Sequence, residues 1–300
     1  MSQRRATDAE AQTMSEVTKI TGPLAIIAGQ GPLPCVLAEA VAAHEIPLHI
    51  VALRGEADEE IERFPHTWMK WGEIGKLFGA LEKSGCNDLV IIGAVNRPDF
   101  GNVRPDFGAI KALPFLLGLG KGGDDSVLSR IVNYFEDMGY RVHGAGDVAP
   151  ELLAGEGMLS TKTPSAEDTT DIELAFKVVR ALGRLDVGQG AIVAKGRVLA
   201  VEAAEGTDAM LQRCADLRTS GRTRGARAGV LVKAPKPGQE ERIDMPTIGP
   251  ETLRKAAAAG LAGIAVAAGR VLLAERAATI EAANENKLFL VGENWDEIDD

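Results

Sequence analysis

Charged and amide side chains gather in two stretches of the second half of the chain. The first stretch holds Glu202, Glu205 and Asp208, and the second holds Lys233, Lys236, Gln239, Arg242 and Asp244. Carboxylates can bind a divalent cation, and ammonium or guanidinium groups can bind an anion. Because both kinds of group follow apolar segments, where α/β domains display functional residues, they predict phosphate-ester or diphosphate chemistry.

Plainer roles compete with a functional one in both stretches. Thr207 or Asp208 is placed to cap a helix that begins there, a contribution of roughly 1 kcal/mol. Lysines in loops are usually solvated, but Pro235 and Pro237 stiffen the loop around Lys236 and would fix its ammonium group. We therefore favour phosphate contact for the lysines and a functional role for the acidic stretch.

The bulk composition narrows the class of protein. The chain has 300 residues, 45% of them hydrophobic, which is enough for two domains or one large domain with a proper core. Lys and Arg total 33 against 43 Asp and Glu, and this acidic balance argues against a nucleic-acid-binding protein. The cysteines and histidines are scattered and form no zinc motif. The odd count of three cysteines, without metal spacing, fits reduced thiols in a cytosolic protein. The sequence shows no secretory signal and no apolar run of roughly 20 residues, the length of a membrane-spanning helix.

The first half of the chain alternates short apolar runs with amphipathic segments. Strands are predicted at Leu24–Ala28, Leu48–Leu53, Leu89–Ala94 and Tyr140–His143, and helices at Pro34–Ala43, at Ile74–Lys83 and up to Gly139. Continuous apolar strands that alternate with helices are typical of parallel sheets buried on both faces. The sequence therefore predicts an α/β fold with a Rossmann-like, mostly parallel sheet.

A glycine turn, Gly29-Gln30-Gly31, stands between the first strand and a helix. In this geometry backbone N–H groups can face an anion. The turn lacks the third glycine of a dinucleotide fingerprint, and Leu53-Arg54 ends the second strand without an acid for a ribose hydroxyl. A nicotinamide or flavin site is therefore disfavoured. A simple tight turn and a loop that touches another ligand both remain open.

Polar residues also follow the third strand and precede the next helix. The segment Asn96-Arg97-Pro98-Asp99 stands at the carboxyl end of a parallel strand, where such sheets bind ligands. An Arg–Asp pair that holds a proline turn is an equal interpretation. Asp124 and Asp125 are placed to cap a helix, and adjacent carboxylates could also hold a divalent ion.

A shift in composition divides the chain near residue 160, because residues 144–164 are rich in Gly, Ser, Thr and Pro. We predict a disordered segment at residues 1–20, an N-terminal α/β domain at residues 21–160 and a C-terminal catalytic domain of mixed α/β structure at residues 165–300. In the second domain Ala191–Val201 predicts a β-hairpin. The similar pattern at Ile264–Ala274 is either a weak internal repeat or a second hairpin.

Six phrases stand in order along the chain. They are AGQGPLP (Ala28–Pro34), NRPDF (Asn96–Phe100), GDD (Gly123–Asp125), LDVGQG (Leu185–Gly190), VEAAEGTDAML (Val201–Leu211) and VKAPKPGQEERIDMPTIG (Val232–Gly249). Together, from about Leu24 to Val291, they resemble the LpxI family of UDP-2,3-diacylglucosamine diphosphatases. Any one phrase is weak evidence, but six in order are specific.

The resemblance implies a Mg²⁺-dependent hydrolase of lipid A biosynthesis in a Gram-negative bacterium. The expected substrate is UDP-2,3-diacylglucosamine, and the expected products are UMP and 2,3-diacylglucosamine 1-phosphate, or lipid X. The family implies a cytoplasmic enzyme, peripheral to the inner membrane, with a lipid chamber between two domains and attack of water on the β-phosphorus. Whether the chain forms a homodimer stays open.

The residues and the resemblance combine into one set of expected roles. The candidate ligands of Mg²⁺ or Mn²⁺ are Glu202, Glu205, Asp208 and Asp244. Lys233 and Lys236 would stabilise charge on the transferring phosphoryl group, and Asp208 or Asp244 would orient or deprotonate the water. The expected substrate contacts are Gly29, Gln30, Gly31, Asn96, Arg97, Asp99, Asp124, Asp125, Gln189, Gly190, Gly206, Thr207, Gln239 and Arg242.

Two other functions share these features. A nucleotide-sugar transferase would use the same sheet, acids and lysines but would release UDP rather than UMP. A nucleotide- or lipid-binding module without chemistry would bind its ligand saturably and form no metal-dependent product.

Overall fold

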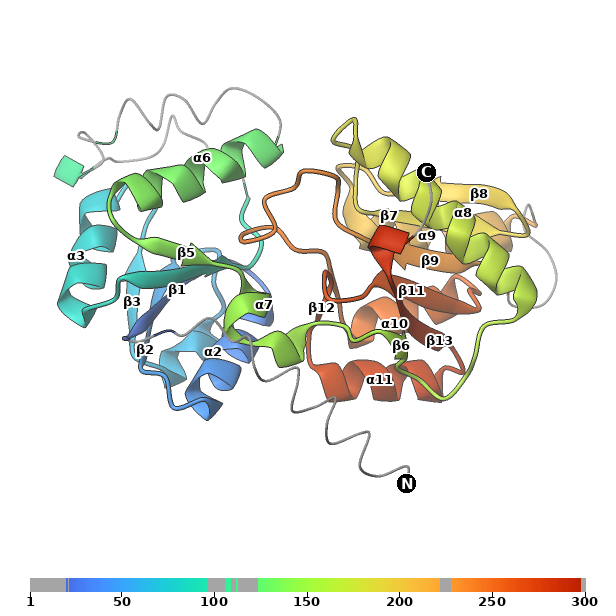
Figure 1. Ribbon diagram of the computed structural model, residues 1–300, viewed down its shortest axis with the longest axis horizontal. Helices are drawn as coiled ribbons and strands as arrows, with labels where there is room; N and C mark the ends of the chain where they lie inside the picture. The colour runs from blue at the N-terminus through green and yellow to red at the C-terminus, as the bar shows by residue number, and fades with distance from the viewer. Residues whose placement is uncertain are drawn as a thin grey trace. The chain divides into compact units, whose positions relative to one another are not determined.

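A computed structural model describes residue 20 and residues 22–96, 106–108, 112, 124–221 and 228–297. The chain divides into two compact units, Met1–Glu151 and Leu152–Asp300 (Figure 1). Each unit is an α/β structure with its own sheet, which confirms the predicted fold class. No helix in these residues combines the length and the apolar character needed to cross a membrane.

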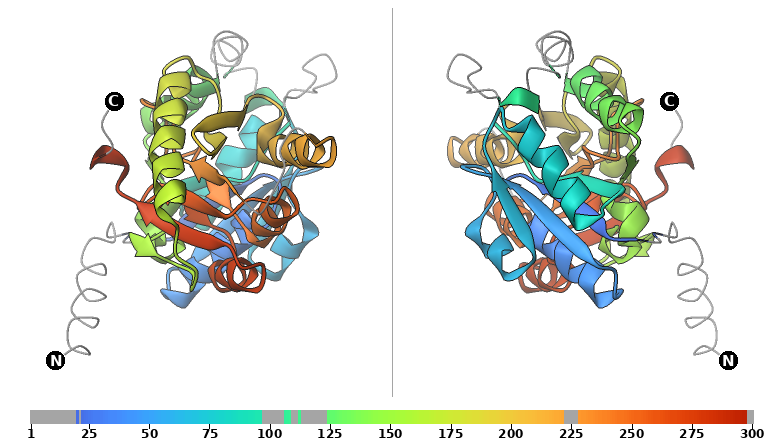
Figure 2. Two further views of the ribbon diagram at one scale, coloured as in Figure 1. Left: turned by 90° about the vertical axis from the view of Figure 1, so that its right-hand side faces the viewer. Right: turned by 90° about the vertical axis from the view of Figure 1, so that its left-hand side faces the viewer.

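The first unit is built around five parallel strands in the order β3-β2-β1-β4-β5. The strands are β1 (Leu24–Ala28), β2 (Leu48–Leu53), β3 (His66–Met69), β4 (Asp88–Ile92) and β5 (Arg141–His143). The helices are α2 (Leu33–Ala43), η2 (Glu59–Arg63), α3 (Ile74–Ser84), α6 (Asp124–Asp137), α7 (Ala145–Val148) and η3 (Pro150–Leu152). Figure 2 shows α2 and α3 on opposite faces of the sheet. Burial on both faces explains why β1, β2 and β4 are continuous apolar runs.

A buried carboxylate joins two neighbouring strands at one edge of this sheet. Asp88 is 2% exposed, and it accepts hydrogen bonds from Arg141 Nε at 2.7 Å and Arg141 Nη2 at 2.6 Å. His143 Nε2 lies 2.7 Å from Asp88 Oδ1. Burial by itself would raise the pKa of Asp88, but the hydrogen bonds from Arg141 and His143 outweigh it and lower that pKa below its usual value.

This arrangement predicts an acid-sensitive first unit. The folded-state pKa of Asp88 lies below the ordinary value of 3.8. The stabilisation is therefore present above about pH 4 and is lost as the pH falls through the folded-state pKa. We expect Asp88→Asn to lower the Tm of the first unit at neutral pH and to flatten its decline in acid. Thermal melts of both proteins across this pH range check it, and equal Tm values at neutral pH would contradict it.

The second unit contains a six-stranded mixed sheet in the order β6-β13-β11-β9-β7-β8 and a two-stranded sheet, β10-β12. The strands are β6 (Gly157–Met158), β7 (Gly190–Ala194), β8 (Arg197–Val201), β9 (Val230–Lys233), β10 (Thr247–Ile248), β11 (Gly263–Ala267), β12 (Leu272–Leu273) and β13 (Phe289–Glu293). The helices are α8 (Ala166–Gly183), α9 (Gly206–Thr219), α10 (Pro250–Ala258), α11 (Arg276–Glu285) and η4 (Trp295–Glu297). Helix α8 covers one face of the six-stranded sheet, and α9, α10 and α11 lie on the other side (Figure 2).

The second unit begins before the predicted boundary near residue 160. Ala154 N donates a hydrogen bond to Val271 O at 2.8 Å, and Leu153 forms a bridge with Leu272. Strand β6 then pairs with β13. The Gly-rich residues near 160 therefore form loops inside the second unit. The chain already belongs to that unit at Leu153 and Ala154, whose backbones pair with it.

One predicted hairpin is confirmed and the other is wrong. Ala191–Val201 forms the hairpin β7–β8. Within Ile264–Ala274, β11 pairs in parallel with β9 and β13, and β12 pairs with β10 instead. Because β11 is central and already has a parallel partner on each side, no edge remains for a hairpin with β12.

Candidate active site

Three neighbouring strands bring candidate residues to one edge of the second sheet. Strand β7 is antiparallel to both β8 and β9, so the carboxyl ends of β8 and β9 flank its amino end. Gly190 lies opposite Lys233 in register, and Glu202 N donates a hydrogen bond to Gly190 O at 2.8 Å. Glu202, Gly190 and Lys233 therefore lie in a row across the three strands.

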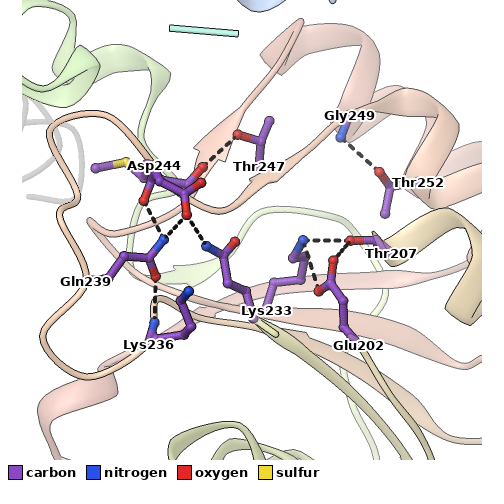
Figure 3. Close-up of polar contacts among 11 residues, drawn as sticks. Glu202, Thr207, Lys233, Lys236, Gln239, Asp244, Thr247, Gly249 and Thr252 are labelled. Carbon is purple, nitrogen blue, oxygen red and sulfur yellow. Dashed lines mark hydrogen bonds and ion pairs between the residues drawn. The ribbon is translucent and has the colours of Figure 1, made fainter. Parts of the chain in front are cut away.

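The Glu202 side chain passes over Gly190 to reach Lys233. A Cβ on Gly190 would lie 2.7 Å from Glu202 Oε2, so only glycine leaves room for this path. Lys233 Nζ lies 3.4 Å from Glu202 Oε2, and the two side chains are 6% and 11% exposed. The Thr207 hydroxyl donates to Glu202 Oε1 at 2.7 Å and accepts from Lys233 Nζ at 2.7 Å (Figure 3). The Lys233 ammonium is thus fixed within a buried ion pair.

The Asp244 carboxylate is held by two amide side chains. Asp244 Oδ2 accepts from Gln239 Nε2 at 2.6 Å and from Gln189 Nε2 at 3.0 Å. Gln239 Oε1 also accepts from the backbone N of Lys236 at 2.7 Å, so Gln239 ties Asp244 to the lysine loop (Figure 3). Two residues expected to bind substrate, Gln189 and Gln239, therefore orient a carboxylate in this structure.

Lys236 is buried in the loop that follows β9. Its Nζ lies 2.5 Å from Asp186 Oδ1, and the side chains of the pair are 7% and 37% exposed. Asp186 was not among the functional residues predicted from the sequence. Its place in the phrase LDVGQG, beside Gln189 and Gly190, was the available signal, but the contact with a lysine 50 residues away depends on the fold.

Two of the predicted acids have other partners. Glu205, at the start of α9, lies 2.5 Å from Arg213 Nη2. Asp208, in the first turn of the helix, lies 2.5 Å from Lys255 Nζ on α10, and its side chain is 64% exposed. Gly206 adopts a φ of +78° between them. The structure thus gives Glu205 and Asp208 cation partners away from Lys233.

Arg242 forms a fork with a nearby carboxylate. Its Nε lies 2.7 Å from Glu240 Oε1, and its Nη2 lies 2.8 Å from Glu240 Oε2. These hydrogen bonds lower the pKa of Glu240. Arg242 therefore shares its guanidinium group with an acid that the sequence analysis had not considered.

The four carboxylates expected to bind a metal do not form one cage. Glu202, Glu205 and Asp208 each have an ammonium or guanidinium partner, as described above. Within the described parts of the chain, no group of three or more His, Cys, Asp and Glu side chains is arranged to hold an ion. Mg²⁺, however, usually takes one or two carboxylates together with substrate phosphates. A site of that simpler kind would need only one carboxylate such as Asp244, which Gln189 and Gln239 orient.

In the first unit, the glycine turn after β1 packs backbone against backbone. A Cβ on Gly29 would lie 2.5 Å from Ala94 O. Gln30 N donates to Ala94 O at 2.7 Å, and Ala94 N donates to Gln30 O at 3.2 Å. Gly31 has a φ of +88°, which favours glycine. Contact between the turns that follow β1 and β4 therefore accounts for Gly29, and the left-handed backbone accounts for Gly31.

Glu56 connects the turns that follow three strands of the first sheet. Gln30 Nε2 donates to Glu56 Oε2, which also accepts from Asn96 N and Asn96 Nδ2 at 3.2 Å each. Glu56 was not predicted from the sequence, because an acid for a ribose hydroxyl is expected directly at the end of β2 and Glu56 follows only after Arg54 and Gly55. Arg97 and Asp99 lie outside the described residues. Asp124 and Asp125 begin α6, but their side chains also lie outside the described part.

The comparisons with known proteins agree with this division into units. The model of the LpxI N-terminal domain matches residues 23–152, and that of the LpxI C-terminal domain matches residues 155–291. The chain is 46% identical over 270 residues to the UDP-2,3-diacylglucosamine pyrophosphatase LpxI of Caulobacter vibrioides. That match covers 90% of this chain and 96% of the relative. The chain therefore belongs to the LpxI family.

Proposed function

We propose that the protein hydrolyses the diphosphate of UDP-2,3-diacylglucosamine to UMP and lipid X in lipid A biosynthesis. The observation that carries this proposal is the edge of the second sheet, where two buried lysines and an oriented carboxylate stand together. The relative in Caulobacter vibrioides, named for the same substrate, supports the choice of diphosphate. UMP release by the purified protein tests the proposal. UDP release would indicate a transferase, and saturable binding without product a binding module.

The two lysines would bind and stabilise the phosphoryl oxygens. Lys233 carries three N–H donors, and its hydrogen bond to Thr207 fixes the direction of the others. Lys236 is held between Pro235 and Pro237 with its side chain buried. Donors that are already oriented stabilise developing charge without reorganising during the reaction, which makes them effective in transition-state stabilisation.

Asp244 would act on the attacking water. In the proposed step the water oxygen attacks the β-phosphorus, and its proton passes to the Asp244 carboxylate. The bond from the β-phosphorus to the bridging oxygen breaks, and UMP leaves with that oxygen. Gln189 and Gln239 would keep the carboxylate oriented. Asp208, the other candidate, is less suited because Lys255 already pairs with it.

The proposal includes Mg²⁺ or Mn²⁺ bound by Asp244 and diphosphate oxygens. Such an ion would neutralise charge on the diphosphate. We expect a chelator to lower UMP release by about 10²-fold or more, since metals contribute several kcal/mol to such reactions. Adding back Mg²⁺ should restore release. In calorimetry, Mg²⁺ should bind to the wild-type protein in the presence of UDP. Under the same conditions it should bind more weakly to the Asp244→Asn variant than to the wild type. Full turnover in the chelator would contradict this part of the proposal.

The substrate also suggests where the protein works. Because UDP-2,3-diacylglucosamine carries two acyl chains, we propose a cytoplasmic enzyme that meets it transiently at the inner membrane surface. Sedimentation with vesicles that contain the substrate would test this. A homodimer is part of the same proposal, and the mass in solution measured by light scattering would test it.

A further inference from the structure

We infer that Asp186 is a positioning residue that holds the Lys236 ammonium where the diphosphate is transformed. This inference rests on the proposed function. It assigns a role to a carboxylate that lies outside the two stretches of charged residues that the sequence indicated. Three independent features of the structure support it: the backbone of Asp186, the packing beneath Lys236 and the ion pair between them.

The backbone of Asp186 lies in the left-handed region, which glycine adopts most readily and which aspartate and asparagine tolerate better than other residues. Asp186 has a φ of +58°, in the left-handed region where a Cβ is disfavoured. The end of α8 imposes this conformation, because Asp186 N donates to Gly183 O at 3.0 Å and Val187 N donates to Leu182 O at 3.1 Å. Glycine is the usual residue at such a helix end. The backbone alone thus favours glycine, and what aspartate adds is its carboxylate.

The end of α8 is packed directly against the lysine loop. A Cβ on Gly183 would lie 2.8 Å from Pro237 Cδ and 3.2 Å from Lys236 Cα. This contact, together with the hydrogen bond from Lys236 N to Gln239, fixes the backbone of Lys236. The long side chain still needs a partner at its end, because four rotatable bonds separate the ammonium from the backbone.

The carboxylate of Asp186 supplies that partner. Its Oδ1 lies 2.5 Å from Lys236 Nζ, and the lysine side chain is only 7% exposed. Removing this carboxylate would weaken the hold on the buried ammonium and let it adopt other rotamers more often. Displacing a group by about 1 Å can reduce turnover by about 10²-fold. Asp186 would therefore affect the rate of the chemical step more than substrate binding.

Two variants of Asp186 test the inference. Asp186→Asn removes the charge and keeps the shape, while Asp186→Gly also relieves the left-handed backbone. We expect kcat for UMP release to fall by about 10- to 100-fold in both, with KM unchanged or lower. The Tm of Asp186→Gly should fall less than that of Asp186→Asn, because glycine relieves the left-handed backbone while both variants lose the ion pair. The matched control is Glu251→Gln, an exposed carboxylate near Lys255 on α10, which should keep kcat within about twofold.

A double-mutant cycle with Lys236→Met separates positioning from a general structural effect. In the Lys236→Met background, Asp186→Asn should no longer change the single-turnover rate, which stays measurable for slow variants. A kcat within about twofold of wild type in both Asp186 variants would overturn the inference. So would an Asp186→Asn substitution that lowers the single-turnover rate by the same factor in the Lys236→Met background as in the wild type. If wild type is active and only the Asp186 results fail, the proposed function stands. If wild type releases no UMP, both fail.

Discussion

Asp244→Asn should reduce kcat/KM for UMP release by about 10²- to 10⁴-fold, the range for a general base, while the protein stays folded. The amide cannot accept the proton of the attacking water. It also binds a divalent cation poorly compared with a carboxylate. Asn keeps the shape of Asp244, and its amide oxygen can accept from both Gln189 and Gln239, which donate to one and the same carboxylate oxygen. Steady-state rates measure the loss of kcat/KM, and thermal melts of the same preparation show whether the variant stays folded.

Asp208→Asn is the informative control for this prediction. The sequence left Asp208 and Asp244 as equal candidates for acting on the water. In the structure Asp208 is 64% exposed and pairs with Lys255, so its loss should change kcat/KM by no more than about twofold. An active Asp244→Asn variant, or an inactive Asp208→Asn variant that remains folded, would contradict the assignment of the base to Asp244.

Lys233→Met should have two large effects. The first is a loss of about 10²- to 10³-fold in kcat, because one oriented donor to the developing charge is removed. The second is a loss of about 3–5 kcal/mol in the free energy of unfolding, because Glu202 would remain buried without its cation. Glu202 is 8% exposed, and Gly190 and Thr207 enclose its oxygens, so water cannot easily replace the ammonium.

The double variant Lys233→Met/Glu202→Gln separates the two effects. Removing both charges should recover much of the free energy of unfolding, since replacing a whole buried pair is often neutral. It should not recover turnover, because the donor to the phosphate is still missing. Urea unfolding and UMP release on the single and double variants measure these quantities. Recovery of turnover in the double variant would contradict the catalytic role of Lys233, and an unchanged stability of Lys233→Met would contradict the buried pair.

The arrangement of strands could largely be predicted from the sequence. Strand β1 is apolar along its whole length and β2 is apolar except for His49, because parallel sheets are buried on both faces, and the predicted bounds of both strands are confirmed. Strand β3, with the sequence HTWM, was missed because it is a half-buried edge strand without a continuous apolar run. The pairing of β12 with β10 also depends on long-range contacts, which a local apolar pattern does not encode.

The candidate site could be predicted only in part. Lys233, Lys236 and Asp244 were selected because they follow one strand and share a proline-stiffened loop. The close spacing of Glu202, Glu205 and Asp208 suggested a single cluster. Glu202 follows the end of β8, however, whereas Glu205 and Asp208 stand at the start of α9, and the three side chains contact different cations. Asp186 could not be found this way, because neither its left-handed backbone nor its contact with Lys236, 50 residues away in the chain, can be read from the local sequence.

The most direct test of the proposed function is a product assay in isotopically labelled water. Purified protein is incubated with UDP-2,3-diacylglucosamine, with Mg²⁺ or with a chelator, and the products are identified by mass spectrometry. The proposal predicts UMP and lipid X only when metal is present, with the label in the phosphate of lipid X, as attack on the β-phosphorus requires. Label in UMP would move the attack to the α-phosphorus. Absence of UMP under every metal condition would contradict the proposed hydrolysis itself.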